Sequence, residues 1–124
     1  MLTATIRYWT DDLGQPTIVG YDNQALHLAD LQAHVTRLAE RPSLSEYNPE
    51  ISGHRAWLTV NDPGYIFHAY FGDDGIDFEW HHQTVGRAEV LGGILQLADL
   101  QEVLRLLDSG EAPEDFLRNF ARHG

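Results

Sequence analysis

The chain contains no cysteine and no lysine among its 124 residues. The absence of cysteine excludes disulfide bonds, thiolate nucleophiles and cysteine-ligated zinc, and it is compatible with a reducing compartment. All 8 basic side chains are arginines, against 19 carboxylates, which gives a formal net charge of -11. Such an acidic chain does not suit nucleic acid or an anionic membrane as a direct ligand, because both attract cationic proteins. The charge instead predicts a basic protein as the partner.

Long apolar runs are also missing from this sequence. No stretch approaches the roughly 20 apolar residues that a membrane-spanning helix requires, and residues 1–7 lack the basic region and apolar run of a secretory signal. We therefore expect a cytoplasmic protein. The hydrophobic content of 43% is that of a folded protein, and the length suits a single domain over residues 1–124.

The first part of the chain predicts a strand hairpin followed by a helix. Residues 2–9 alternate between apolar and polar side chains, and after a short turn-forming segment the alternation resumes over residues 17–21. Apolar residues then recur at helical spacing: Leu28, Leu31, Val35 and Leu38. Pro42 limits how far this helix extends. Residues 42–53 contain turn formers without any period, which indicates a surface loop.

The middle of the chain contains three strand-like runs, at residues 55–60, 65–71 and 76–82. Their separators are rich in Asp, Gly and Pro, which favours tight turns. A two-residue turn at Asp73 and Asp74 fixes the register of the flanking strands. It pairs Phe71 with Ile76, Ala69 with Phe78 and Phe67 with Trp80. We expect this aromatic face to belong to the core, because each such ring removes on the order of 150–250 Å² from water.

The helices predicted near the C-terminus share a local sequence with the first helix. Residues 97–101, Leu-Ala-Asp-Leu-Gln, repeat residues 28–32, so both segments are expected to begin a helix in the same way. Gly110 suits the end of the second helix. Pro113 can begin a short third helix, which buries apolar residues after it.

One more strand-like run and the order of the elements complete the predicted fold. Residues 88–95 contain Gly92 and Gly93, which indicate a bulge or a weak edge strand. Strands, a helix, further strands and then helices are typical of an α+β fold. We expect a single-domain antiparallel sheet meander with helices packed on one face.

The polar face of the central hairpin is the strongest candidate site. Alternation places His68 and Tyr70 beside Asp77 and Glu79 on one side of the sheet, with two more carboxylates at the tip. Carboxylates accept bidentate bonds from arginine, and tyrosine adds contact area. We therefore expect this surface to bind basic side chains of a partner through His68, Tyr70, Asp73, Asp74, Asp77 and Glu79. A solvated polar face is the alternative, since antiparallel sheets commonly leave one face in water.

The same face also offers a metal site as an alternative. His68, Glu79 and His81 can converge on one ion, because a cross-strand pair and a residue two positions along share a face. Such a site would suit a small metal-dependent hydrolase. No zinc-binding or nucleophile motif accompanies these residues, so the prediction is a protein that is not an enzyme and has no cofactor or metal. A third possibility is an acidic adaptor or dimerisation domain, with Ile66 and Tyr70 in its patch.

The C-terminal segment resembles the ending of a known family. An amphipathic helix over residues 99–109 runs into a Gly-x-x-Pro segment at residues 110–113, and Phe116 follows. With a strand pair before the helix of residues 28–38, and Leu-Thr-Val at residues 58–60 before aromatic strands, the chain is similar to the Imm1 family of bacterial immunity proteins. The resemblance implies a cytoplasmic antidote that binds and occludes a secreted toxin, frequently a nucleic-acid deaminase. It assigns no binding residue.

Such a toxin would account for the charge of the chain. A toxin that acts on nucleic acid presents a basic substrate channel, and an acidic domain can occupy that channel in place of phosphate. Association of this kind is fast and salt-sensitive.

Overall fold

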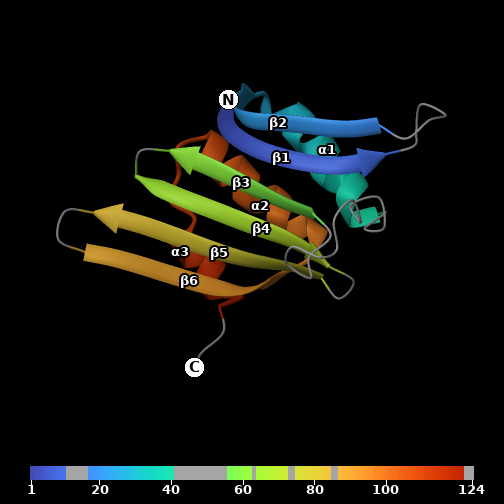
Figure 1. The fold of residues 1–124 in the computed structure, drawn as a ribbon. Coiled ribbons are helices and arrows are strands. Elements are labelled where there is room, and N and C mark those ends of the chain that lie inside the picture. Colours follow the sequence, from blue (N-terminus) through green and yellow to red (C-terminus); the bar gives the residue numbers. More distant parts are fainter. Residues whose placement is uncertain (11–16, 41–55, 63, 73–74, 85–86, 122–124) are drawn as a thin grey trace.

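The computed structural model describes residues 1–10, 17–40, 56–62, 64–72, 75–84 and 87–121. The strands are β1 (Leu2–Thr10), β2 (Thr17–Leu26), β3 (Ala56–Asp62), β4 (Tyr65–Gly72), β5 (Gly75–Thr84) and β6 (Arg87–Leu95), and the helices are α1 (Leu28–Glu40), α2 (Leu97–Asp108) and α3 (Glu114–Arg118). The strands form one antiparallel sheet in the order β2-β1-β3-β4-β5-β6 (Figure 1). The predicted α+β fold is confirmed. The loop expected at residues 42–53 lies outside the described residues.

The sheet is built from two hairpin systems that meet at β1. β1 pairs antiparallel with β2 on one side and with β3 on the other. From β3 onward each strand pairs with the next, as a meander. The register predicted for the central hairpin is confirmed, with Phe71 opposite Ile76, Ala69 opposite Phe78 and Phe67 opposite Trp80. This register places the aromatic side chains on one face of the sheet, because alternate residues of a strand point the same way.

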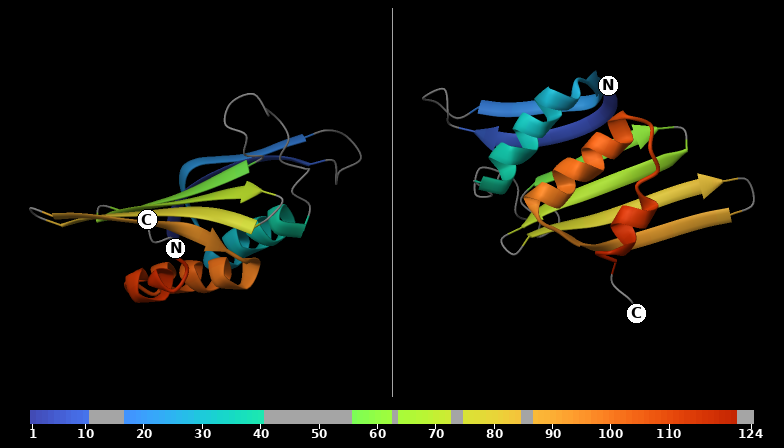
Figure 2. Two further views of the ribbon diagram at one scale, coloured as in Figure 1. Left: turned by 90° about the horizontal axis from the view of Figure 1, so that it is seen from below. Right: turned by 180° about the vertical axis from the view of Figure 1, so that it is seen from behind.

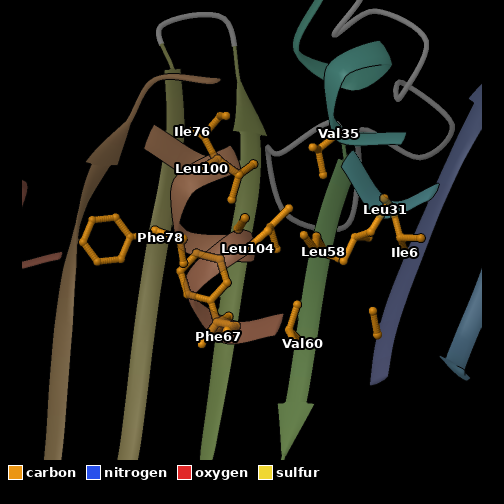
Figure 3. Packing of buried hydrophobic residues seen from close by; sticks show 14 of the residues in the cluster. Ile6, Leu31, Val35, Leu58, Val60, Phe67, Ile76, Phe78, Leu100 and Leu104 are labelled. Carbon is orange, nitrogen blue, oxygen red and sulfur yellow. The ribbon is translucent and has the colours of Figure 1, made fainter. Parts of the chain in front are cut away.

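All three described helices lie on that aromatic face (Figure 2). α1 buries Leu31, Val35 and Leu38, and α2 buries Leu100, Val103, Leu104 and Leu107. These side chains pack against the inner residues of the strands, among them Ile6, Leu58, Phe67 and Phe78 (Figure 3). Burial of each such side chain stabilises the fold by about 1.5–3 kcal/mol. The core therefore holds the sheet from one side only.

The repeated local sequence begins both long helices, as predicted, and it also joins them. Gln32 and Gln101 occupy equivalent positions in the two copies. The side-chain amide of Gln101 donates to the Gln32 carbonyl at 3.2 Å and to the Thr36 hydroxyl at 2.8 Å. The amide nitrogen of Gln101 is thereby paired at the α1–α2 contact, whereas its Oε1 is buried without a hydrogen-bond partner among the described residues.

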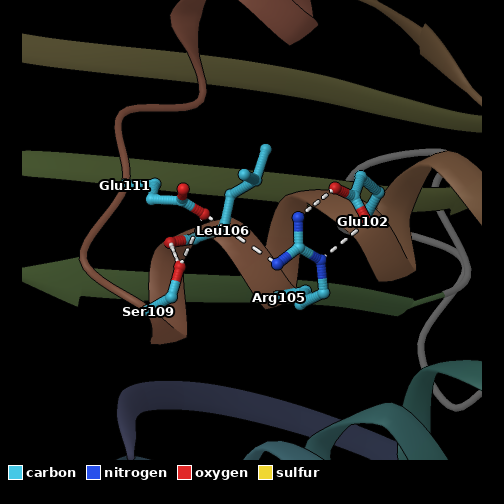
Figure 4. A network of polar contacts seen from close by, with 5 residues as sticks. All are labelled: Glu102, Arg105, Leu106, Ser109 and Glu111. Carbon is cyan, nitrogen blue, oxygen red and sulfur yellow. Dashed lines mark hydrogen bonds and ion pairs between the residues drawn. The ribbon is translucent and has the colours of Figure 1, made fainter.

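The end of α2 is fixed by a glycine cap and by an exposed polar network. Gly110 has a φ of 79°, and the Glu111 amide donates to the Leu106 carbonyl at 2.9 Å. Arg105 donates to Glu102 at 2.6 and 3.0 Å, and Ser109 lies 3.0 Å from the Leu106 carbonyl (Figure 4). The cap confirms the helix end predicted from the sequence.

β6 is an edge strand of the sheet. Gly92 and Gly93 indicated either a bulge or an edge strand, and the edge strand is confirmed. Its register with β5 continues without interruption through Gly92 and Gly93. A register shift is found instead in the β1–β2 pair, where Asn23 has a φ of 52° and its amide donates to the Thr5 hydroxyl at 2.8 Å. Ala121 forms an isolated antiparallel bridge with Gly93 of β6.

None of the described helices has the length and apolar character that crossing a membrane requires. The cytoplasmic location stays a prediction.

Candidate functional site

The face of the sheet turned away from the helices carries three rows of side chains across β3 to β6. We call this surface the open face. The strand registers align its rows as Trp57-Tyr70-Asp77-Ile94, Thr59-His68-Glu79-Gly92 and Asn61-Ile66-His81-Val90. No described helix covers it, because all of them pack on the opposite side (Figure 2).

Exposed large hydrophobic side chains lie on this face, three of them at the ends of the rows and Ile66 within its row. Four of them have the exposed fractions Trp57 41%, Ile66 39%, Val90 61% and Ile94 39%. Among the described residues, Met1 is the only other large hydrophobic residue with comparable exposure. Single exposed apolar residues are ordinary, whereas several on one face of a sheet are typical of a binding surface.

A hydrogen-bonded polar group occupies the centre of the open face. The Thr59 hydroxyl lies 2.9 Å from Nδ1 of His68, and the His68 ring stacks on Tyr70 with centroids 6.0 Å apart. Burial raises the pKa of Tyr70, and the charge of Glu79 and a hydrogen bond to it raise that pKa further. Burial lowers the pKa of His68, partly opposed by Glu79. Negative charge at neutral pH therefore comes from Asp77 and Glu79.

The structure brings together four of the six residues predicted to bind a partner. Tyr70 lies opposite Asp77 and His68 lies opposite Glu79, all on the open face. The other two predicted residues, Asp73 and Asp74, lie outside the described residues. Partner binding by any of the six stays a prediction.

The adjacent histidines of β5 point to opposite faces, as alternation predicts. His81 lies on the open face, where its ring is 5.8 Å from that of His68. His82 lies on the helix side, with Nδ1 2.9 Å from the Glu114 carboxylate and its ring 5.9 Å from Trp80. His82 therefore contributes to the contact between α3 and the sheet and not to the open face.

Sequence reasoning missed three apolar members of this surface: Trp57, Val90 and Ile94. The signal for Trp57 was present, because it alternates with Leu58, which is fully buried. The three residues lie beside the central hairpin only because β3 pairs with β4 and β5 pairs with β6. The alternation of side chains within one strand predicts which residues share a face, but it does not predict which strands lie on either side.

His68, Glu79 and His81 form a cluster of potential metal ligands. One ligand atom from each lies within 4.8 Å of those from the other two. Two imidazoles and a carboxylate are ligands that transition metals accept. The geometry therefore supports the metal-site alternative more strongly than the spacing in the sequence does.

Among the described residues, two pockets lie outside this cluster. One is lined by the end of α1 and the start of α2, including Glu40 and Gln96. The other adjoins the open face at Trp57 and is lined by Arg7 and Asp22, among others. The second pocket extends the open face toward β1 and β2.

Comparison with protein-family models, with curated proteins and with solved structures gives no match for this chain. The resemblance to the Imm1 family therefore stays a prediction.

Proposed function

We propose that this protein is a non-enzymatic inhibitor of the immunity type, which binds a basic protein toxin through its open face and occludes the toxin's active site. The observation that carries the proposal is the composition of that face. Exposed apolar side chains at the row ends, such as Trp57 and Ile94, frame a centre that carries Asp77 and Glu79. Protein interfaces commonly combine an aromatic anchor with polar groups that fix orientation.

The charge of the chain supports a basic partner. The formal net charge is -11, and Asp77 and Glu79 add negative charge at the centre of the face. Exposed ion pairs contribute only about 0–1 kcal/mol each, so the carboxylates act mainly on the association rate and on partner choice. Trp57 and Tyr70 supply the contact area that holds the complex.

Self-association through the open face is the adaptor alternative, and the exposed Ile66 favours it. Two copies meeting face to face would bring Asp77 and Glu79 of each copy close to the same carboxylates of the other. Like charges in contact oppose association. A basic partner avoids this repulsion, and for that reason we propose it ahead of a dimer.

The hydrolase alternative gains no support from the two pockets described above. Neither is lined by His68, Glu79 or His81. A metal-dependent hydrolase needs a concave site that positions its substrate beside the ion.

A survival assay tests the proposal. The chain is co-expressed in a bacterial host with the toxic protein encoded next to its own gene, and colony survival is counted. Wild-type protein is expected to restore growth. The double variant Asp77→Arg/Glu79→Arg is expected to abolish the protection, because it places positive charge against a basic surface.

A charge-matched variant on the helices serves as the control. Glu40→Arg/Asp115→Arg changes the net charge by the same amount, at exposed positions of α1 and α3. This control should protect like the wild type. Equal protection by both double variants would remove the open face from the interface, and no protection by the wild type would contradict the proposed function itself.

A further inference from the structure

Three metal-ligating side chains lie together on the open face. The ring nitrogens of His68 and His81 and a carboxylate oxygen of Glu79 offer ligand atoms within 4.8 Å of one another. Nε2 of His81 is 3.6 Å from Oε2 of Glu79, and the two imidazole centroids are 5.8 Å apart. We propose that these three residues bind one divalent transition-metal ion of the zinc class.

The separation of the ligand atoms is close to what one ion requires. Bonds of about 2.1 Å at tetrahedral angles place ligand atoms about 3.4 Å apart. The limit of 4.8 Å exceeds this by about 1.4 Å. The side chains of His81 and Glu79 are 37% and 51% exposed, so rotation about their side-chain bonds can close the gap without backbone movement.

The backbone positions of the ligands are fixed by the sheet. His68 lies directly opposite Glu79 in the β4–β5 register, and His81 follows Glu79 by two residues on the same face. Both strands are interior to the sheet, because β4 also pairs with β3 and β5 also pairs with β6. A site on paired strands holds its ligands more accurately than one on a loop.

A neighbouring hydroxyl orients the His68 ring. Oγ1 of Thr59 lies 2.9 Å from Nδ1 of His68, and Thr59 is only 8% exposed. When Nδ1–H donates to this hydroxyl, the lone pair of Nε2 is left for a metal ion. Metal-binding histidines commonly have such a partner on the second ring nitrogen. Thr59 is therefore a positioning residue for the proposed site.

The ligand types select among metals. Two imidazoles favour zinc, cobalt, nickel and copper, whereas calcium and magnesium prefer oxygen ligands. Three protein ligands leave the fourth position of a tetrahedral ion for water or for a partner's side chain. The site is complete within one chain, so the inference does not depend on the proposed toxin.

Isothermal titration calorimetry with zinc chloride tests the site. The full chain is used without a histidine tag, after removal of metals with a chelator. We expect saturable binding of one zinc ion per chain and no binding of magnesium chloride. His68→Gln and His81→Gln should each abolish saturable binding. Thr59→Val should weaken binding by about 10–100-fold, because the ring loses its orienting partner.

A matched histidine control distinguishes the site from general zinc binding. His27 is exposed and lies between β2 and α1, away from the cluster, so His27→Gln should bind zinc like the wild type. Far-ultraviolet circular dichroism checks the fold of every variant. The His81 side chain is 37% exposed and only partly buried, so its variant should disturb the fold least. Absence of saturable binding by the wild type, or zinc binding retained by the double variant His68→Gln/His81→Gln, would overturn the proposal. Neither result bears on toxin binding, since no partner is present.

Discussion

The contact between β6 and the C-terminal segment can be tested with a single methyl group. Gly93 is buried on the inner face of β6, opposite Phe78, and pairs with Ala121. A Cβ atom at Gly93 would lie 1.9 Å from the carbonyl oxygen of Phe120 and 3.0 Å from a ring carbon of Phe78. Gly93→Ala therefore requires the backbone at Phe120 to move away by about 1.5 Å to reach ordinary contact.

Two routes to this displacement have similar costs. If the segment stays in place under strain, overpacking costs about 1–3 kcal/mol. If the segment leaves the strand, the partly buried Phe120 loses its packing, including its contact with Phe116 at a centroid distance of 5.3 Å. Partial loss of aromatic burial and of that pair also amounts to about 1–3 kcal/mol. We expect Gly93→Ala to lower the free energy of unfolding by that amount.

The adjacent glycine provides the matched control. A Cβ atom at Gly92 would meet only the Phe78 carbonyl oxygen within 4 Å, at 3.4 Å, so Gly92→Ala should be neutral or stabilise the protein by up to about 1 kcal/mol. Urea unfolding followed by circular dichroism measures both. With an m value of about 1.5 kcal/mol per molar urea, a loss of about 1–3 kcal/mol should lower the midpoint of Gly93→Ala by about 0.7–2 M. Equal midpoints for the two variants would refute the close approach of the C-terminal segment.

Two further predictions concern His34 and Trp57. Burial lowers the pKa of His34, whose Nδ1 lies 2.8 Å from the Tyr8 hydroxyl, so the fold favours the neutral ring. The stability that this provides is present above the unfolded-state pKa of 6.5 and is lost as the pH falls below it, because the unfolded chain takes up the proton first. Removal of the titrating ring in His34→Gln should therefore make the free energy of unfolding fall less between neutral and mildly acidic pH. Urea unfolding at several pH values measures this. An unchanged pH dependence would exclude His34 as a source of the acid sensitivity. Trp57 is only 41% exposed, so Trp57→Ser also loses packing and should lower the free energy of unfolding by about 1–3 kcal/mol. Toxin binding by the folded variant should weaken by about 2 kcal/mol or more in calorimetry, as for an interface anchor, and unchanged affinity would remove Trp57 from the interface.

Local sequence chemistry predicted those elements whose geometry is decided by near neighbours. The β4–β5 register followed from one short turn and from alternation, and the ends of α2 followed from residues 97–101 and Gly110. The position of β1 between β2 and β3 could not be obtained this way, because it depends on how α1 returns the chain to the sheet. The register shift in the β1–β2 pair was also not predicted, because no glycine marks it in the sequence. The residue with a positive φ at this place is Asn23.

The candidate site was predicted in its polar part and missed in its apolar part. His68, Tyr70, Asp77 and Glu79 belong to one hairpin, so a single register brings them together. The apolar residues that frame them come from β3 and β6, and only the assembled sheet places those strands on either side. The resemblance to the Imm1 family implied a role for the chain but did not indicate which surface binds the toxin. In the proposal, the open face is that binding surface.

Hydroxyl-radical footprinting of the complex with the toxic partner tests the central claim most directly. Partner binding is expected to protect the aromatic side chains Trp57 and Tyr70 on the open face from oxidation. Phe116 of α3, on the helix side of the sheet, should react equally in the free and bound protein. Protection of Phe116, with unchanged oxidation of Trp57 and Tyr70, would contradict the account and place the interface on the helices.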